Sequence, residues 1–463
     1  MEAATDATVP SEQPSLLAGP PLSLPAGVPE TLAEVLLRAA VPGGPGGVVQ
    51  VQGDGGEVAL GYDAVLARAR RVLGGLRARG VRPGDAVLLQ ARSAEDFLPA
   101  LWACVLGGLM AGPASLPAGG EDEAGARQIL EAWAALDRPL VLAADEHVAA
   151  VRAALAADAL VAPAGELAAH ARDEAWHPAA PDDVAALLLS SGTTGRPKLI
   201  RRTHRNLLRA CQASISSAGL GARSITFLSW LPLDHNAAFS SSLALAAAGA
   251  TLVHLRTRDV LENPGCWLDA LHRHRVTHTG ATNYSLDLFA AHLAAAPAGA
   301  WDLSCVERIT ATAEPLAART ARAFLDRTAP YGLRRDVLRP SYGMSETGGI
   351  ARLAEFRLGD ADGDDTFVEV GSPIPGIELR VVDAEGRVVP RGSEGRVQVR
   401  GETVTPGYQG DPELTPASFT ADGWFDTGDV GVVRGESLAL VGRDKDVLIV
   451  NGHNLHTREV EAV

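Results

Sequence analysis

The sequence predicts an α/β protein in which parallel sheets covered by helices are followed by a smaller antiparallel β-unit. Up to Thr310, short apolar runs typical of buried strands alternate with amphipathic stretches of helical spacing. After Phe367 the pattern changes to short alternating runs separated by glycines, which is typical of a small β-barrel or sheet. The chain has 463 residues, 46% of them hydrophobic, so it is long enough for several packed units.

The first half of the chain supplies the strand–helix alternation in order. Thr31 and Glu34 have the spacing of a capping box, which predicts that a helix begins there. The elements predicted after it are a helix over Asp63–Arg79 that ends at Gly80, a strand at Ala86–Gln90, a helix around Phe97–Met110 and a strand at Leu140–Ala143.

The alternation resumes at Val184 and indicates a second, related α/β unit. Its predicted strands are Val184–Leu189, Ile225–Leu228, Thr251–Leu255 and Val306–Thr310, with helical stretches such as Asn206–Ser216 between them. The strands predicted for the C-terminal β-unit are Ile377–Val382 and Arg396–Arg400, and a further apolar strand is predicted at Val447–Val450.

The charge balance argues against a nucleic-acid surface. The chain has 41 Lys and Arg against 56 Asp and Glu, a net charge of −15, which favours a soluble cytoplasmic protein. No apolar run reaches membrane-spanning length, so no membrane partner is expected. Residues 1–27 are rich in Pro, Ala and Ser, have no basic leader or apolar signal core, and are predicted to be disordered.

The cysteines and histidines do not indicate a metal or disulfide framework. The four cysteines lie far apart and are interpreted as reduced, mostly buried thiols: Cys104, Cys211, Cys266 and Cys305. His272, His274 and His278 straddle a predicted helix end and strand, so we interpret them as structural or surface residues.

The most informative segment is the loop that follows the strand at Val184–Leu189. Its residues, Ser190-Ser191-Gly192-Thr193-Thr194-Gly195-Arg196-Pro197-Lys198, let the backbone approach an anion and offer amide and hydroxyl donors to phosphate oxygens. Lys198 adds a mobile positive charge. The glycines are too close together for a Walker loop and no Ser or Thr follows the lysine, so a kinase-like phosphotransferase is disfavoured. Taken alone, the segment also fits an ordinary polar turn.

Three later segments carry groups that suit a nucleotide. In Ser341–Gly348, which has no strong periodicity, an exposed Tyr342 ring could stack on a base and Glu346 could hold Mg²⁺. Asp429 follows a glycine turn, where its carboxylate could accept hydrogen bonds from ribose hydroxyls. Gly442–Asp446 is a charged turn before the strand at Val447.

In this order, the segments Ser190–Lys198, Tyr342–Glu346, Thr427–Asp429 and Gly442–Asp446 resemble the core signatures of the adenylate-forming superfamily. Its members include acyl-CoA synthetases, nonribosomal peptide synthetase adenylation domains and fatty acyl-AMP ligases. The resemblance covers Thr31–Val463. It implies a large AMP-binding domain of two α/β subdomains and a small β-barrel, ATP and Mg²⁺ as cofactors, and attack of a substrate carboxylate on the α-phosphorus.

The resemblance also implies roles for individual residues. Tyr342 would pack against adenine with Gly343 beside it, Ala313 and Glu314 would line the other side, and Asp429 and Arg443 would hold the ribose. Ser345 would contact the α-phosphate, and Glu346 would bind the Mg²⁺. The residues implied to grip the phosphates are Ser190, Ser191, Gly192, Thr193, Thr194, Gly195 and Lys198; those implied to act in catalysis are Thr193, Lys198, His235 and Glu346.

The segment Trp230–Asn236 is similar to the part of fatty acyl-AMP ligases and acyl-CoA synthetases in which a histidine borders the acyl carboxylate. This implies that His235, Asn236 and Asn283 contact the acid, although a structural role for a buried His235 stays open. Amino-acid-activating domains normally place an aspartate where this chain has Asn236. A neutral residue forms no ion pair with an α-ammonium group, so an α-amino acid substrate is disfavoured.

The segment Gly442–Glu461 looks more like acyl-AMP ligases that load carrier proteins than like CoA-using enzymes. Together with the Trp230–Asn236 segment it resembles ligase modules found with polyketide synthases, which implies a fatty or other acyl acid, an acyl carrier protein and its phosphopantetheine thiol as acceptor. Two alternatives stay open: an acyl- or aryl-CoA synthetase, and a non-catalytic acyl- or nucleotide-binding module.

The sequence therefore predicts three regions. Residues 1–27 form a disordered N-terminal segment, residues 28–444 form the AMP-binding domain, and residues 445–463 hold the hinge and the start of a lid domain. Lys445 lies where the family has its inter-domain hinge. Because the chain stops at Val463, we expect the lid, which supplies a catalytic lysine in the family, to be almost entirely absent, with turnover weakened as a result.

Overall fold

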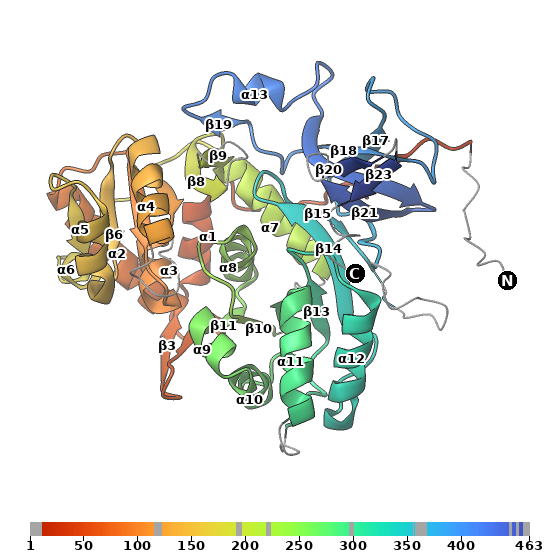
Figure 1. The fold of residues 1–463 in the computed structure, drawn as a ribbon. Coiled ribbons are helices and arrows are strands. Elements are labelled where there is room, and N and C mark those ends of the chain that lie inside the picture. The colour runs from red at the N-terminus through yellow and green to blue at the C-terminus, as the bar shows by residue number, and fades with distance from the viewer. Residues whose placement is uncertain are drawn as a thin grey trace.

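In a computed structural model, the described residues form two mixed sheets, a five-stranded antiparallel sheet and a two-stranded hairpin (Figure 1). The structure describes residues 12–114, 123–190, 197–218, 224–295, 301–354, 356, 368–443, 447–450 and 453–456. The predicted α/β class with an added β-unit is confirmed.

The first sheet has the strand order β19-β9-β8-β5-β4-β6-β7, and its central strands are parallel. In that order the strands are Tyr408–Gln409, Lys198–Thr203, Val184–Ser190, Met110–Pro113, Ala86–Gln90, Leu140–Ala143 and Val161–Pro163. The helices in this part of the chain are α1 Leu32–Ala39, α2 Tyr62–Ala78, α3 Ala94–Gly107, α4 Glu123–Ala135, the 3-10 turn η1 Asp145–His147, α5 Val148–Ala154 and α6 Ala164–Ala168.

The second sheet has the order β16-β15-β14-β13-β12-β10-β11-β2-β3. In that order the strands are Ser372–Pro373, Gly348–Arg352, Leu338–Met344, Arg308–Ala311, His278–Ala281, Thr226–Ser229, Thr251–Leu255, Gly47–Val51 and Glu57–Gly61. The helices of this region are α7 His204–Ala218, α8 Asn236–Ala248, α9 Thr257–Glu262, α10 Gly265–Arg273, α11 Asn283–Ala295, α12 Ala318–Thr328 and the 3-10 turn η2 Ala329–Tyr331.

The third sheet is antiparallel, with the order β1-β17-β18-β20-β21. Its strands are Leu16–Ala18, Ile377–Val382, Glu394–Gly401, Phe425–Arg434 and Ser437–Arg443, and the short helix α13 Leu414–Ala417 lies between β19 and β20. A separate hairpin joins β22 Val447–Val450 to β23 His453–His456. The strand predicted at Val447–Val450 is therefore present.

The prediction of disorder over residues 1–27 is wrong for the part that the structure describes. Leu16–Ala18 pairs with β17, and the Ser15 amide donates to the Val389 carbonyl at 2.8 Å. Leu17 is buried and Leu16 is exposed, which is the alternation of an edge strand with one covered face. A three-residue strand among prolines carries too short a pattern to be seen in the sequence.

The two α/β units also exchange strands in a way the sequence did not predict. The strand β8, expected to open the second unit, lies beside β5 in the first sheet, whereas β2, from the first part of the chain, pairs with β11 in the second sheet. Apolar periodicity fixes the kind of element but not its neighbour, because pairing between distant strands depends on tertiary packing.

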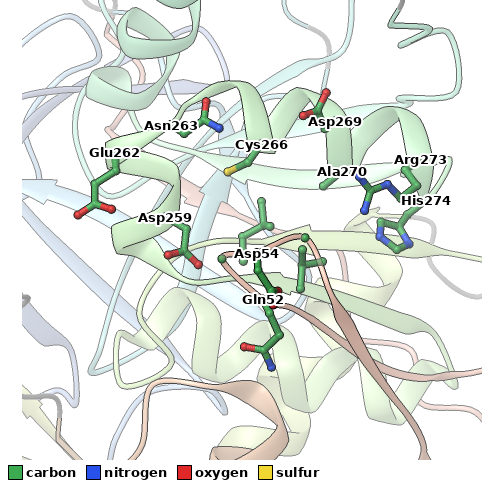
Figure 2. Close-up of a pocket in the computed structure, with 14 residues that line it drawn as sticks. Gln52, Asp54, Asp259, Glu262, Asn263, Cys266, Asp269, Ala270, Arg273 and His274 are labelled. Carbon is green, nitrogen blue, oxygen red and sulfur yellow. The ribbon is translucent and has the colours of Figure 1, made fainter.

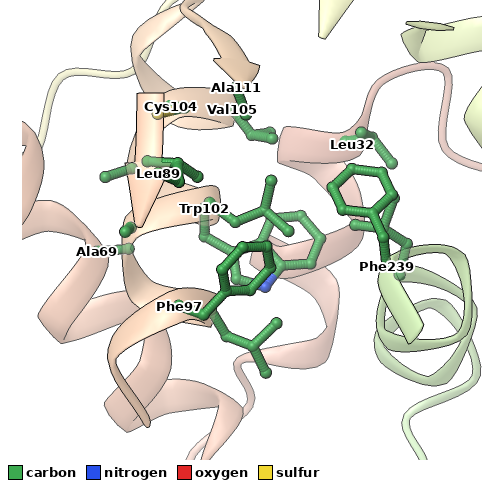
Figure 3. Close-up of a cluster of buried hydrophobic side chains, with 14 of the residues drawn as sticks. Leu32, Ala69, Leu89, Phe97, Trp102, Cys104, Val105, Ala111 and Phe239 are labelled. Carbon is green, nitrogen blue, oxygen red and sulfur yellow. The ribbon is translucent and has the colours of Figure 1, made fainter. Parts of the chain in front are cut away.

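One apolar cluster joins the two sheets (Figure 3). Phe97 and Trp102 of α3 pack with Leu32 of α1 and Phe239 of α8, and each of these side chains is about 1% exposed. Because α8 covers the second sheet and α3 covers the first, this shared core fixes the position of one sheet relative to the other. Cys104 belongs to it, as predicted for a buried thiol, and burial raises its pKa to about 12.

Candidate functional site

The carboxyl ends of the parallel strands bring most of the predicted residues to one edge of the second sheet. Strands β10, β12, β13 and β14 run in the same direction. The loops that leave their carboxyl ends carry, in that order, His235 and Asn236, Asn283, Ala313 and Glu314, and Ser345 and Glu346. Ligands bind at this edge in open α/β sheets, so the fold gathers residues that are more than 100 positions apart into one candidate site.

His235 and Asn236 lie where α8 begins. The His235 Nδ1 accepts from the Ala237 amide at 3.3 Å, so the neutral ring carries its hydrogen on Nε2. Neighbouring protein atoms that displace water lower the pKa of this imidazole, which keeps it neutral at pH 7. A neutral Nε2–H can donate to a carboxylate oxygen of a substrate.

The Asn236 side chain is held by two neutral groups. Its Nδ2 donates to the Met344 carbonyl at 3.2 Å, and its Oδ1 accepts from the Ser240 hydroxyl at 3.0 Å. This links the start of α8 to the end of β14. The side chain at this position is therefore ordered and uncharged.

Asn283 and Glu314 join two of the loops at this edge. The Asn283 Oδ1 accepts from the Ala317 amide at 3.0 Å, and a Glu314 oxygen accepts from the Tyr284 amide at 2.7 Å. Between them, Ala313 has a φ of 75°, a conformation that L-residues rarely adopt and that concentrates at functional sites. The Asn283 side chain thus contacts Ala317, the residue that precedes α12, and its contact with the acid stays a prediction.

Tyr342, Asp429 and Arg443 form a connected group between the second and third sheets. The Tyr342 hydroxyl donates to Asp429 Oδ2 at 2.5 Å, and Arg443 Nε lies 3.2 Å from Asp429 Oδ1. Burial, and next the Asp429 charge, raise the pKa of the tyrosine. The ring is 7% exposed, so the expectation of an exposed ring is wrong: Tyr342 lies within β14, in a hairpin with β15, and packs in the core.

A second group links Lys198 to Glu346. The Lys198 Nζ lies 5.5 Å from the centre of the Tyr408 ring, and the Tyr408 hydroxyl donates to Glu346 Oε1 at 3.1 Å. Arg202, fully buried, donates to the Ser345 carbonyl at 2.6 Å, and burial lowers its pKa to about 10 while the Glu346 charge opposes that shift. The Arg202 cation therefore lies near the buried Glu346 carboxylate, and Lys198 is linked to that carboxylate through Tyr408.

The Glu346 carboxylate fits the predicted Mg²⁺ role. One oxygen takes the tyrosine hydroxyl, and no hydrogen bond to the other oxygen occurs within the described residues. The described parts of the chain hold no group of three or more His, Cys, Asp or Glu suited to a metal. A single carboxylate suits Mg²⁺, which is commonly bound by one or two carboxylates together with substrate phosphates.

The phosphate loop itself is placed only at its two ends. Ser190 ends β8 opposite Lys198, which begins β9, so the loop closes an antiparallel pair. The other predicted loop residues, Ser191, Gly192, Thr193, Thr194 and Gly195, and the predicted hinge residue Lys445, lie outside the described residues. Their roles stay predictions.

Sequence reasoning missed Tyr408 and Arg202. Tyr408 is an isolated aromatic in a Pro- and Gly-rich stretch, and only its pairing with β9 brings it beside Lys198. Arg202 follows Arg201 in an ordinary-looking basic pair, and its complete burial could not be read from the sequence. A lone aromatic between glycine turns is the one signal that could have drawn attention to Tyr408.

A cavity of about 300 Å³ lies at the carboxyl ends of β2 and β11 (Figure 2). Its walls come from the β2–β3 turn, α9 and α10, and carry Asp54, Asp259, Glu262 and Asp269. Strand β2 is five positions from β14 in the sheet order, about 24 Å at the spacing of strands, and none of the predicted site residues lines the cavity.

The cysteines and histidines occupy structural positions. Cys104 and Cys211 are buried, and Cys266 and Cys305 are partly buried; all four are free thiols. His278 is buried in β12, and burial lowers its pKa to about 4. No helix in the described part of the chain has the length and apolar character to cross a membrane.

Comparison with known proteins agrees with this geometry. The model of a family described as "AMP-binding enzyme" matches residues 38–409. Inactive atromentin synthetase invA3 of Paxillus involutus is 34% identical over 306 residues, which cover 62% of this chain and 31% of that protein. The chain thus spans about a third of the length of this curated relative.

Two groups of solved structures share the fold. The adenylation domain of a keto acid-selecting NRPS module, bound to a keto acyl adenylate, superposes with a TM-score of 0.88 at 32% identity, covering 97% of this chain and 89% of its own. A fatty acyl-adenylate ligase, from a study of the E. coli and L. pneumophila enzymes, superposes with a TM-score of 0.83 at 25% identity. The match covers 93% of this chain and 82% of the ligase chain. The family match covers most of the chain, and the fold agrees with it: the chain belongs to the AMP-binding enzyme family.

Proposed function

We propose that the protein uses ATP and Mg²⁺ to convert a carboxylic acid without an α-ammonium group into its acyl-adenylate, and passes the acyl group to the phosphopantetheine thiol of a carrier protein. The acceptor belongs to a polyketide or nonribosomal peptide assembly line. Release of pyrophosphate accompanies the first step: the substrate carboxylate oxygen bonds to the α-phosphorus as the bond from that phosphorus to the bridging oxygen breaks.

The neutral, ordered Asn236 is the observation that carries the choice of acid. Both of its hydrogen-bond partners, the Met344 carbonyl and the Ser240 hydroxyl, are uncharged. An α-ammonium group placed there would lose hydration without gaining an ion pair, which is costly in a partly buried site.

The comparisons favour a 2-oxo acid as the first substrate class. The superposed NRPS domain is described as selecting keto acids, and its identity to this chain is higher than that of the fatty acyl-adenylate ligase. A fatty acid is the second candidate, because the ligase shares the fold across 93% of this chain.

The residues at the sheet edge suit this reaction. The neutral His235 Nε2–H would orient the acid, and Asp429 with Arg443 would offer an acceptor and a donor to the ribose hydroxyls. Arg202 supplies positive charge near the carboxylate of Glu346, which would hold Mg²⁺, and Lys198 beside the Tyr408 ring would add a second positive charge. The bound ion would neutralise phosphate charge. Alignment and charge neutralisation of this kind supply catalysis without a protein nucleophile.

Acid-dependent exchange of pyrophosphate into ATP tests the proposal. The panel contains 2-oxo, fatty, aryl and α-amino acids matched in side chain. We expect exchange with an acid that lacks the ammonium group, and at least about tenfold less with its amino counterpart, as expected for an unpaired buried charge. Exchange with amino acids alone would contradict the choice of acid.

The acceptor is tested separately with a phosphopantetheinylated carrier protein and with free CoA. Thioester formation on the carrier supports the proposal, and thioester on CoA alone would instead identify an acyl- or aryl-CoA synthetase. If ATP and a stable acyl-adenylate analogue bind while no acid supports exchange, the protein is the non-catalytic binding module.

A further inference from the structure

Three arginines and one histidine share one face of the second sheet. The register pairs His278 of β12 with Arg308 of β13, Thr310 of β13 with Arg339 of β14, and Ser341 of β14 with Arg352 of β15. Paired residues, and residues two apart in one strand, point to the same face. His278, Arg308, Arg339 and Arg352 therefore form one basic cluster across four neighbouring strands.

The same face leads from this basic cluster to the candidate acid site. Gly280, Thr310 and Ser341 lie on it, two residues nearer the carboxyl edge, and all three are partly exposed. A Cβ placed on Gly280 would meet no atom within 4 Å, so open space adjoins the strand there. The opposite face, with Ile309 and Ala311, packs in the core with residues of α11 and α12 (Figure 1).

Two of the arginines have no acidic partner among the described residues. Arg308 donates to the Ser217 carbonyl at 3.1 Å and Arg352 to the Ser217 hydroxyl at 2.7 Å, and no carboxylate of the described chain lies within ion-pair distance of either. The Arg352 Nε is buried without a hydrogen-bond partner. Burial lowers the pKa of Arg352 to about 10, and the Arg308 charge adds to that shift.

The C-terminal end of α7 explains only part of this arrangement. Ser217 lies in the last turn of that helix, where carbonyl groups need donors and positive charge is favourable. A helix end is equivalent to about half a negative charge, however, whereas Arg308 and Arg352 bring two full positive charges. Among the described residues, a net positive charge is therefore left in a partly desolvated place, where a further anion would be stabilising.

We infer that the acid activated here carries a second carboxylate, at the end remote from the activated one, and that Arg308 and Arg352 bind it. This inference rests on the proposed function and narrows its substrate to dicarboxylic acids. Arg339 and Gly343 are four residues apart along β14, about 13 Å at the rise of a strand. The acid therefore has a chain of medium length between its two carboxylates, because malonate-sized acids are too short to span that distance.

Paired acids of equal length provide the test. Pyrophosphate exchange is measured with dicarboxylic acids of four to twelve carbons, with and without a 2-oxo group, and with the monomethyl esters of their remote carboxylates. We expect one medium-length diacid to exceed its ester at least about tenfold in kcat/KM, as charge-assisted hydrogen bonds to a buried guanidinium imply.

Variants then locate the effect. Arg308→Met and Arg352→Met should abolish the preference for the diacid, mainly through a higher KM, and should leave exchange with the monoester within about twofold of the wild type. Arg308→Lys keeps the charge and should retain part of the preference. Arg334→Met is the matched control, because Arg334 is exposed and already paired with Asp336 at 2.9 Å.

The outcomes separate the inference from the proposed function. Equal use of diacid and ester by the wild type would overturn the inference while leaving adenylation of acids intact, and this comparison needs no variant to fold. A preference that survives both methionine variants would also overturn it. If no acid supports exchange, the inference falls together with the proposed function.

Discussion

Tyr408 connects the charged residues of the candidate phosphate site. Its ring faces the Lys198 ammonium and its hydroxyl holds one oxygen of Glu346. Burial, and next the Glu346 charge, raise the pKa of Tyr408, so the phenol stays protonated and remains a donor. Removing the Lys198 ammonium group, or the Tyr408 hydroxyl that reaches Glu346, should therefore change how ATP is bound.

Lys198→Ala should weaken pyrophosphate exchange at least about tenfold, because a mobile positive charge near the phosphates is lost. Arg205→Ala serves as control, since the Arg205 side chain is exposed and paired with Asp182 at 2.7 Å. Exchange rates at saturating acid decide the matter: an unchanged rate in Lys198→Ala would contradict the phosphate-gripping role.

Tyr408→Phe should raise the KM for MgATP several-fold and also lower the free energy of unfolding. The substitution deletes one hydrogen bond to a buried carboxylate, about 1.5 to 3 kcal/mol for a charged acceptor, but keeps the ring beside Lys198. Tyr331→Phe, in the partly buried contact with Trp301, is the matched control. Equal KM values for the two variants would show that the Glu346 contact is unimportant.

At the level of single residues, the sequence predicted which residues belong to the site better than it predicted what each of them contacts. The motif residues Asn236, Glu346 and Asp429 were identifiable because small, charged and glycine residues stood in a known order. The contacts that define them, such as Tyr342 with Asp429 across 87 positions, depend on strand register. The buried ring of Tyr342 was missed because an aromatic beside glycines looks exposed when its hairpin is unknown.

The edge strand β1 shows how a short element can matter to a whole sheet. It covers β17 from outside and buries Leu17, while the neighbouring Leu16 is 45% exposed. The N-terminal segment continues as Gly19 donates to the Ile377 carbonyl at 2.8 Å.

Leu17→Ala should lower the free energy of unfolding by about 2 kcal/mol or more, the range for truncating a buried leucine. Leu16→Ala, one residue earlier on the exposed face, should change it by less than about 0.5 kcal/mol. Urea unfolding followed by circular dichroism compares the two. Equal effects would mean that residues 16–18 do not pack on the third sheet.

Elements with a long apolar pattern were predicted within a few residues. The strands at Ala86–Gln90, Leu140–Ala143, Thr251–Leu255 and Ile377–Val382 agree in both bounds, whereas the helix expected to run to Met110 ends at Gly107. Gly108 has a φ of 67° and closes the helix, so that Met110 starts β5. The apolar run continues through this turn, so the sequence pattern did not reveal the end of the helix.

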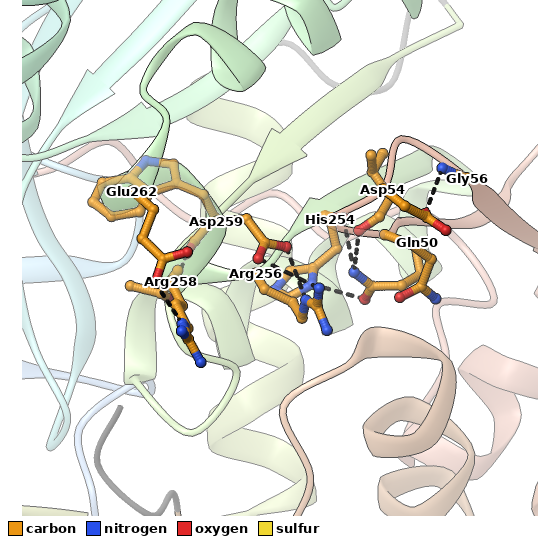
Figure 4. A network of polar contacts seen from close by, with 12 residues as sticks. Gln50, Asp54, Gly56, His254, Arg256, Arg258, Asp259 and Glu262 are labelled. Carbon is orange, nitrogen blue, oxygen red and sulfur yellow. Dashed lines mark hydrogen bonds and ion pairs between the residues drawn. The ribbon is translucent and has the colours of Figure 1, made fainter. Parts of the chain in front are cut away.

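Across the whole molecule, buried neutral histidines should make stability depend on pH. Gln50 and His254 are fully buried neighbours at the ends of β2 and β11, with Gln50 Oε1 3.0 Å from His254 Nδ1 (Figure 4). Burial lowers the pKa of His254 to about 4, as it does for His204 and His278. Each of them gains a proton more easily in the unfolded chain.

Below the unfolded pKa of about 6.5 the unfolded state therefore binds more protons, and stability falls as pH falls. Between pH 7 and pH 5, His254 alone should cost about 2 kcal/mol. The free energy of unfolding differs between these two pH values, and in His254→Gln this difference should be about 2 kcal/mol smaller than in the wild type. In His272→Gln, at an exposed position, the difference should stay at the wild-type value. A wild type equally stable at both pH values would contradict the assignment.

The exchange of strands between the two sheets is the feature of the whole molecule that the sequence did not reveal. Placing β8 in the first sheet puts Ser190 and Lys198 opposite one another, and β19 returns from beyond residue 400 to set Tyr408 next to that pair. The phosphate site therefore depends on contacts between distant parts of the chain, which local patterns do not encode.

The phosphorus-containing products of the acid-dependent reaction show which phosphorus atom of ATP the acid attacks. The protein is incubated with MgATP and its preferred acid, and the phosphorus-containing products are separated and weighed by mass spectrometry. We expect pyrophosphate and an acyl-adenylate, with AMP appearing only as the adenylate is consumed. Formation of ADP and an acyl phosphate would contradict it, because attack would then fall on the γ-phosphorus.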